Sequence, residues 1–364
     1  MIADRLKLAR KKAGYSLRDL STAMDNKVTA QAIGKYERGE SIPSSDVLVA
    51  LVKALDVSLD YLLDVQEIEL TGVEFRTKAN TTGKDRAHVE TDVLEWIERY
   101  LQIERVLELD SAEWHSPLAG PRKLRTIQEA EVLADEVRKK WALGIDPIPN
   151  MTELLEEKGL KVCTAPLPDR VSGFTCLVNR ADAEPLPVIV VNNQFTLERR
   201  RLTLGHELAH RLIAPDSFSE KDEEKAATVF GAAFLMPRVH LLREVGKHRN
   251  AFGYNEIIQL KRIYRVSGSA LLMRLRQIDV INDATLTYAF QSVARGWRTQ
   301  EPRELEPPEQ RGEHERAQRF DRLCYRALAE GFITLSKTAE LLRLPLHKVE
   351  AGLKGPQSPD ADHC

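Results

Sequence analysis

Residues 202–212 read Leu-Thr-Leu-Gly-His-Glu-Leu-Ala-His-Arg-Leu and predict a helix with one apolar side and one side that carries two histidines. Positions i and i+4 of a helix lie on one face, so His206 and His210 can hold one cation between them. Glu207 lies about 100° further around the helix, close enough to take a proton from a water molecule at that cation. The stretch predicts a metallopeptidase site with zinc as its metal and Glu207 as its general base.

Two solvated histidines on a surface helix are the alternative, because chance produces this five-residue pattern in on the order of a few chains per hundred. The apolar side of the helix, with Leu204, Leu208 and Leu212, argues against that alternative and predicts a core helix. Buried histidine and glutamate side chains need partners, since burying them unpaired costs free energy. A metal ion would supply the partner.

A second predicted helix, residues 220–236, offers a third ligand. Small residues at Ala227 and Gly231 let it approach the first helix closely, and Glu224 lies one turn earlier on the same stripe. Two histidines and one glutamate leave a fourth position open, as in catalytic zinc sites. Glu223 is the rival ligand, and an exposed carboxylate at a helix start is the alternative interpretation of Glu224.

Four blocks of the sequence together resemble the ImmA/IrrE metallopeptidases. The blocks are Val-Ser-Gly-Phe at 171–174, Ile-Val-Val-Asn at 189–192, and the segments 199–210 and 224–237. The resemblance covers roughly residues 125–280 and implies His206, His210 and Glu224 as zinc ligands. It also implies Glu207 as the catalytic base and a folded or partly folded DNA-binding repressor as the protein substrate.

One position departs from the family pattern. The family usually has asparagine after the alanine that aligns with Ala227, where this chain has Thr228. Threonine keeps a hydrogen-bonding group, so we interpret the difference as a change beside the ligands and not as the loss of a ligand.

Residues 1–64 alternate short apolar-periodic segments with turn residues and predict an all-α domain of five helices. Ser16 and Thr29 are placed to cap the helices that follow them. The segments 5–16 and 33–43 resemble the XRE/Cro-type helix-turn-helix domain, and the resemblance covers essentially all of residues 1–64. It implies double-stranded DNA as a partner, bound at a palindromic operator by a homodimer.

The helix that opens at Thr29 is the predicted reading helix. Its predicted DNA-contacting residues are Thr29, Ala30, Gln31, Lys35 and Arg38. Glutamine can read an adenine edge, and the methyl group of alanine or threonine can touch thymine. Lys35, Arg38 and the basic residues 10–12 are placed for phosphate contacts, with an ordinary solvated face as the alternative for residues 10–12.

Changes in composition divide residues 65–364 into five expected regions. We expect a linker and a spacer or dimerisation helix over 65–123, a zincin-like peptidase domain over 124–294, a polar linker over 295–319, a helix-turn-helix-like module over 320–355 and a flexible tail over 356–364. The linker is expected to be solvated because Glu, Arg, Pro and Gln dominate it. Short strands are expected near residues 162, 174–178 and 188–191. The fold class is therefore mainly α and multidomain, with an α+β peptidase domain that holds a small sheet.

The overall composition restricts the possible partners. The formal net charge is −2, so any DNA-binding surface must be a local patch. The four cysteines are scattered without metal-ligand or redox spacing, which fits a reducing cytoplasm. We find neither an apolar signal core nor a membrane-spanning stretch and expect a cytoplasmic protein without a membrane partner.

Together these features predict a DNA-binding transcription regulator that carries a zinc endopeptidase. Cleavage of a repressor or antitoxin-type protein would serve a stress, phage or toxin–antitoxin response. The alternative is a non-enzymatic repressor or antitoxin whose peptidase-like domain is a sensor or partner-binding module, although the intact Glu207 argues against it. Residues 333–349 predict either a second DNA-reading element or a small two-helix module that packs on the peptidase or holds a partner. The cleaved protein, the operator, the inducing signal, the oligomeric state and whether the protease is active or latent stay open.

Overall fold

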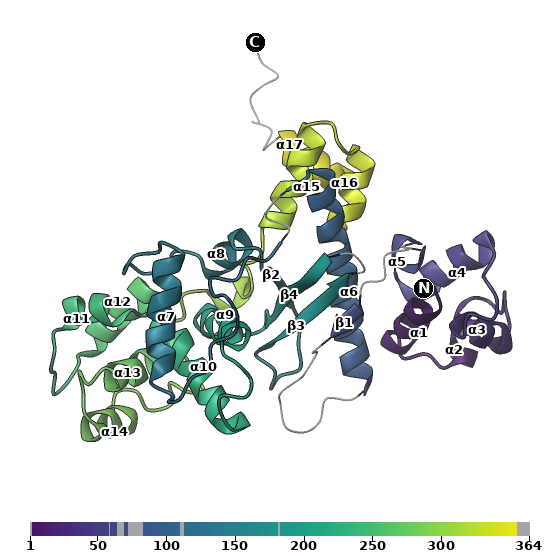
Figure 1. Ribbon diagram of the computed structural model, residues 1–364. Helices are drawn as coiled ribbons and strands as arrows, with labels where there is room; N and C mark the ends of the chain where they lie inside the picture. The colour runs from purple at the N-terminus through teal and green to yellow at the C-terminus, as the bar shows by residue number, and fades with distance from the viewer. Residues whose placement is uncertain are drawn as a thin grey trace, which may run out of the picture.

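A computed structural model of the chain describes residues 2–57, 59–63, 69–71, 83–109, 113–180 and 183–354 (Figure 1). The predicted tail at 356–364 and most of the predicted polar connection after residue 64 lie outside the described residues. The mainly α, multidomain fold class is confirmed, with one small mixed sheet among the described residues.

The N-terminal region, residues 2–63, contains the five predicted helices. They are α1 (Ile2–Lys12), α2 (Leu17–Ala23), α3 (Ala30–Glu37), α4 (Ser45–Leu55) and α5 (Leu59–Leu63). The two predicted caps are confirmed, because the hydroxyl of Ser16 accepts from the backbone N–H of Asp19 and that of Thr29 from the N–H of Ala32. The helices pack on a compact apolar cluster in which Leu6, Leu20, Ile33 and Leu51 are fully buried.

The sheet has four described strands in the order β1-β3-β4-β2. The strands are β1 (Glu69–Thr71), β2 (Lys161–Ala165), β3 (Gly173–Arg180) and β4 (Ala183–Asn192). β3 pairs antiparallel with β4 and with β1, whereas β2 runs parallel to β4. The three predicted strands are confirmed, but β1 lies where the sequence predicted a polar connection. It was missed because three residues are too few to show a periodicity.

Both faces of the sheet are covered by helices, which explains why β4 is apolar on both sides. Ile189 and Val191 face the helices of the central region, and Val188 and Val190 face the long helix α6 (Gly83–Val106). Within the region 65–123, where a spacer or dimerisation helix was expected, the apolar side of residues 93–107 does not form an exposed interface. Those residues are buried against the sheet of the same chain, so their apolar side chains are not available to contact a second copy.

The central region, residues 113–294, carries most of the remaining helices. They are α7 (Glu129–Lys140), α8 (Met151–Glu157), α9 (Leu197–Leu212), α10 (Glu220–Leu235), α11 (Arg238–Val245), α12 (Tyr254–Tyr264), α13 (Gly268–Gln277) and α14 (Asp283–Gln291). α9 carries the histidine motif and packs on α10 on one side and on β3 and β4 on the other. Among the described residues, no helix has the length and apolar character needed to cross a membrane.

Residues 295–318, which we call the strap, correct the prediction of a solvated linker. The Glu306 side chain is fully buried and binds both Nη atoms of Arg200 at 2.7 and 3.1 Å. Glu315 pairs with the buried Arg201, and Glu301 lies 3.2 Å from the ammonium of Lys261. Three glutamates of the strap therefore form ion pairs with buried cations of the central region, while about half of the strap's residues are exposed.

The C-terminal module consists of α15 (Arg319–Ala329), α16 (Leu335–Leu342) and α17 (Leu346–Lys354). Phe320, Cys324 and Leu341 are buried in the same cluster as α6, and Arg343 pairs with Glu95 of α6. Of the two predictions for this module, packing against the rest of the chain is confirmed. DNA reading by α16 and α17 stays a prediction.

Candidate metal centre and nucleic-acid interface

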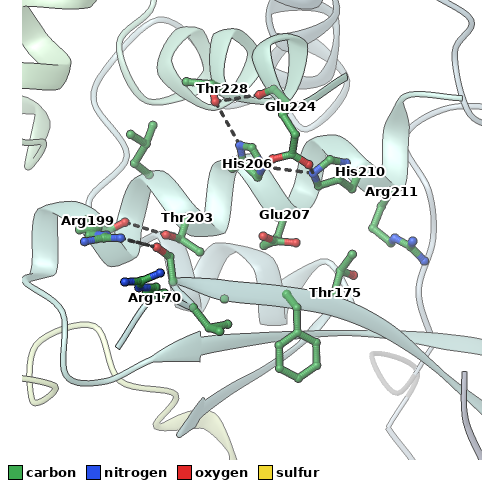
Figure 2. A pocket seen from close by; sticks show the side chains of 15 residues that line it. Arg170, Thr175, Arg199, Thr203, His206, Glu207, His210, Arg211, Glu224 and Thr228 are labelled. Atoms are coloured by element: carbon green, nitrogen blue, oxygen red, sulfur yellow. Dashed lines mark hydrogen bonds and ion pairs between the residues drawn. The ribbon is translucent and has the colours of Figure 1, made fainter. Parts of the chain in front are cut away.

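Two glycines allow α9 and α10 to come into direct backbone contact. A Cβ atom added at Gly205 would lie 3.0 Å from Cα of Gly231, and one added at Gly231 would lie 3.0 Å from the backbone nitrogen of His206. Ala227 and Gly231 lie in the interface, as the small-residue stripe predicted. This contact brings the start of α10 to the histidine face of α9 (Figure 2).

The three predicted ligands converge. His206 Nε2 lies 3.1 Å from His210 Nε2 and 3.2 Å from Glu224 Oε2, and His210 Nε2 lies 3.5 Å from Glu224 Oε1. Zinc bonds of about 2.0–2.2 Å in a tetrahedron place ligand atoms about 3.3 Å apart. The donor types and their spacing therefore both fit a zinc ion held by two histidines and one glutamate.

Nδ1 of each histidine ring has a hydrogen-bond acceptor, which indicates that the ring proton is on Nδ1 and the lone pair is on Nε2. Thr228 donates its hydroxyl proton to the backbone oxygen of Glu224 at 2.9 Å, so at 3.3 Å it accepts from Nδ1 of His206. Glu223 Oε1 lies 3.1 Å from Nδ1 of His210 and accepts from it. Both Nε2 atoms therefore carry lone pairs that face each other and a carboxylate, an arrangement that a cation stabilises.

The adjacent carboxylates Glu223 and Glu224 have different positions. Glu224 turns both carboxylate oxygens toward the two histidines, with Oε2 3.2 Å from Nε2 of His206 and Oε1 3.5 Å from Nε2 of His210. Glu223 contacts the far side of the His210 ring. Glu223 therefore has the position of a group that orients the ring, and Glu224 has the position that fits a ligand.

Glu207 projects from α9 into a cleft of about 420 Å³, whose opposite wall is β3 (Figure 2). A Cβ atom at Gly173 would lie 2.6 Å from the backbone oxygen of Val190 and 2.7 Å from the methyl group of Thr203. Only glycine lets β3 pass this close to α9. The cleft brings a candidate base beside the candidate metal ligands, which is an arrangement suited to hydrolysis.

The predicted DNA-contacting residues lie along α3, away from the cleft. Thr29, Gln31, Lys35 and Arg38 are exposed and Ala30 is partly exposed, whereas Ile33 is fully buried. Thr29 also caps the helix, which leaves its methyl group for contact with a base. Arg38 binds Glu40 at 2.6 Å, so a phosphate contact would have to displace that exposed carboxylate.

Two of the basic residues of α1 are not available for phosphate in this structure. Arg10 binds both carboxylate oxygens of Glu37, at 2.6 and 2.9 Å, and ties α1 to α3. Lys12 pairs with Asp92 of α6. The prediction of phosphate contacts from residues 10–12 is therefore corrected for Arg10 and Lys12, while Lys11 is exposed.

Two groups of residues at the sites were given no role from the sequence, although most of them lie in the blocks that carry the family resemblance. One is the pair Gly173 and Gly205, whose lack of a side chain sets the spacing around α9. The other comprises Arg170, Ser172 and Arg199, which line one end of the cleft. The three consecutive arginines at 199–201 were a signal, but the sequence does not tell which of them faces the cleft.

Two comparisons with known families agree with these sites. Residues 6–62 match the family described as helix-turn-helix, and residues 155–276 match the family described as the IrrE N-terminal-like domain. No curated protein matches the chain. The chain therefore joins an N-terminal region similar to XRE-type helix-turn-helix domains to a metallopeptidase-like region of the ImmA/IrrE kind.

Proposed function

We propose that this protein is a DNA-binding transcription regulator whose central region is a zinc-dependent endopeptidase acting on a repressor or antitoxin-type protein. The observation that carries the proposal is the convergence of His206, His210 and Glu224 beside Glu207 in an open cleft. A stress, phage or toxin–antitoxin response is the setting in which cleavage of such a partner would change transcription.

His206, His210 and Glu224 would hold the metal in this proposal. When bound, zinc would polarise the scissile carbonyl group and lower the pKa of a water molecule to about 7. Glu207 accepts the proton of the attacking water on its carboxylate and passes it to the nitrogen of the departing peptide. Glu223 and Thr228 keep the two imidazole rings in the tautomers that direct Nε2 into the site.

The substrate would bind as an extended segment along β3. Among the described residues, β1 covers the edge of β3 away from β4 only at residues 177–179. Gly173 and Thr175 of β3 line the cleft together with Glu207, so a segment added along β3 would lie beside the candidate base. Extended binding requires a mobile segment in the substrate, which is consistent with cleavage at one specific site.

The N-terminal region would place α3 in the major groove of double-stranded DNA, with Gln31 at a base edge and Lys35 at a phosphate. Binding as a homodimer to a palindromic operator belongs to this proposal. Because the apolar side of α6 is buried within the chain, we expect the dimer contact elsewhere.

Cleavage of repressors and antitoxins encoded beside this protein tests the proposal. Each candidate is incubated with zinc-loaded protein, with and without a chelator, and products are identified by mass spectrometry. We expect one cut that the chelator prevents and that Glu207→Gln abolishes, while Glu157→Gln, at an exposed carboxylate on α8, cleaves normally. If no candidate is cut in a Glu207-dependent way and Glu207→Gln leaves regulation unchanged, the non-enzymatic alternative holds.

A further inference from the structure

The three consecutive arginines at the start of α9 have different surroundings. Arg200 and Arg201 are buried and paired with Glu306 and Glu315 of the strap. Arg199 instead lines the cleft, together with Arg170 from the loop before β3. Among the described residues, no carboxylate lies within ion-pair distance of Arg170 or Arg199, so these two positive charges are not neutralised within that part of the chain.

Arg199 is held in a defined orientation. Its guanidinium carbon lies 3.7 Å from the centre of the Phe195 ring, and Nε and Nη2 donate to the hydroxyl of Ser172 at 3.2 and 2.8 Å. Stacking on one face and two hydrogen bonds at one edge restrict the side chain. Three of the five guanidinium N–H groups stay free for a ligand, and they need no reorganisation to bind one.

Charge is distributed unevenly along the cleft. Arg170 and Arg199 lie together at one end, the carboxylates of Glu207 and Glu224 lie toward the middle, and the single arginine Arg211 lies at the opposite end (Figure 2). A substrate segment that crosses the cleft past Glu207 must therefore pass a site of concentrated positive charge. A side-chain carboxylate is the group that best fits this end, because it accepts two parallel hydrogen bonds from a guanidinium.

We infer that Arg170 and Arg199 bind an aspartate or glutamate of the protein substrate, a few residues from the scissile bond and on one side of it only. This inference rests on the proposed function and narrows its substrate class to segments with an acidic residue at a fixed distance from the cut. Arg199 supplies the oriented donors, and Arg170 adds charge beside it.

Peptide binding to the Glu207→Gln protein tests the inference without requiring catalysis. The probes are fluorescein-labelled decapeptides with a central Leu-Phe, in which one glutamate, glutamine or lysine is moved through the other positions. With zinc present, we expect glutamate at one register to bind about tenfold more tightly than glutamine, and the difference to shrink at high salt. The readout is fluorescence anisotropy.

Three further substitutions are compared in the same Glu207→Gln background. Arg199→Gln should remove the preference for glutamate, Arg199→Glu should replace it with a preference for lysine, and Arg262→Gln, at an exposed site on α12, should preserve it. The inference is overturned if glutamate and glutamine peptides bind equally well, if Arg199→Gln keeps the preference, or if no peptide binds.

The outcome separates this inference from the proposed function. A protein that cleaves a repressor without preferring an acidic residue retains the proposed function and loses the inference. A protein that binds acidic peptides through Arg199 but cleaves nothing retains the inferred carboxylate site and loses the peptidase assignment.

Discussion

The N-terminal and central regions place their candidate functional residues in opposite ways. α3 presents Gln31 and Lys35 to solvent on a single helix whose only structural requirement is a buried inner face. The candidate metal centre needs α9, α10 and β3 at fixed separations, set by glycine contacts at Gly205, Gly231 and Gly173. A candidate site can be recognised in the structure of the protein alone when side chains from distant segments meet at one point. The role of an exposed reading helix becomes visible only when DNA is bound.

The two regions also handle charge differently. In the N-terminal region, Arg38 and Glu40 pair while 58% and 49% of their side chains are exposed. Between the central region and the strap, Arg200 and Glu306 pair while only 4% and 0% of their side chains are exposed. An exposed pair contributes little to stability, but removing one partner of a buried pair strands the other charge. An arginine–glutamate pair therefore matters for stability where it is buried, as in Arg200–Glu306, and contributes little where it is exposed, as in Arg38–Glu40.

Removing the buried partner should have the largest effect. Glu306→Ala leaves Arg200 buried without its carboxylate and should lower the free energy of unfolding by about 3–5 kcal/mol. All four tryptophans lie outside residues 2–63, so tryptophan fluorescence during urea unfolding reports on the remainder of the chain. Glu40→Ala should leave unfolding unchanged when it is followed by far-UV circular dichroism, to which the five helices of residues 2–63 also contribute. Equal effects of the two substitutions would remove the contrast between the regions.

A buried carboxyl on α8 should make the stability of the same unit depend on pH. Burial raises the pKa of Glu156 to about 8, and the group receives a hydrogen bond from Tyr100. Between the usual carboxyl pKa and pH 8 the folded protein keeps this proton while the unfolded chain loses it. Stability should therefore fall as pH rises through this window, by up to a few kcal/mol at about 1.4 kcal/mol per pKa unit.

Glu156→Gln removes this titration. The variant should be more stable than the parent at pH 8.5, and its stability should change less between pH 5.5 and 8.5, as measured by urea unfolding followed by tryptophan fluorescence. Glu157→Gln, at the exposed neighbouring position, should keep the parent's pH profile. A parent whose stability does not fall over this range would contradict a protonated Glu156.

The adjacent glutamates on α10 distinguish a metal ligand from an orienting group. Removing an outer-shell partner typically reduces metal affinity about 10–100-fold, so we expect that loss for Glu223→Ala and a larger one for Glu224→Ala. Zinc affinity is measured by competition with a chromophoric chelator. Operator DNA binding should be unaffected by both substitutions, and a larger loss for Glu223→Ala would reverse the two roles.

The smallest expected effect concerns the reading helix. Gln31→Ala should weaken specific operator binding by about 1–3 kcal/mol and relax the sequence preference at one base pair. Lys35→Ala should weaken binding to all sequences alike and reduce the salt dependence of binding by about one phosphate contact. Both are measured by anisotropy with labelled operator DNA. If Gln31→Ala affects all sequences equally, it contacts the backbone and not a base.

Local patterns predicted the features that depend on neighbouring residues. The caps at Ser16 and Thr29, the five N-terminal helices and the strands around Val162 and Val190 follow from spacing and residue type. The three candidate ligands could also be chosen, because helical spacing places His206 and His210 together and a small-residue stripe marks the facing helix.

Features that depend on distant partners could not be predicted. Glu306 meets Arg200 across 106 positions, and a glutamate in a polar segment looks the same whether it is buried in a pair or solvated. The apolar side of α6 predicted an interface, but its spacing cannot show that the interface lies within the chain. The orientation of Arg199 toward the cleft likewise depends on Phe195 and Ser172, which the helix pattern does not include.

The double covering of the sheet decides how the protein can be divided for experiments. A recombinant fragment cut at residues 155–276, the extent of the family match, would lack α6 and α15. Val188, Val190 and Cys176 would then face water across one whole side of the sheet, which favours aggregation. A truncation that begins before β1 and ends after α17 keeps both coverings, but it removes Arg5 of α1, which pairs with the buried Glu98 of α6, so proteolysis should be assayed in the full chain.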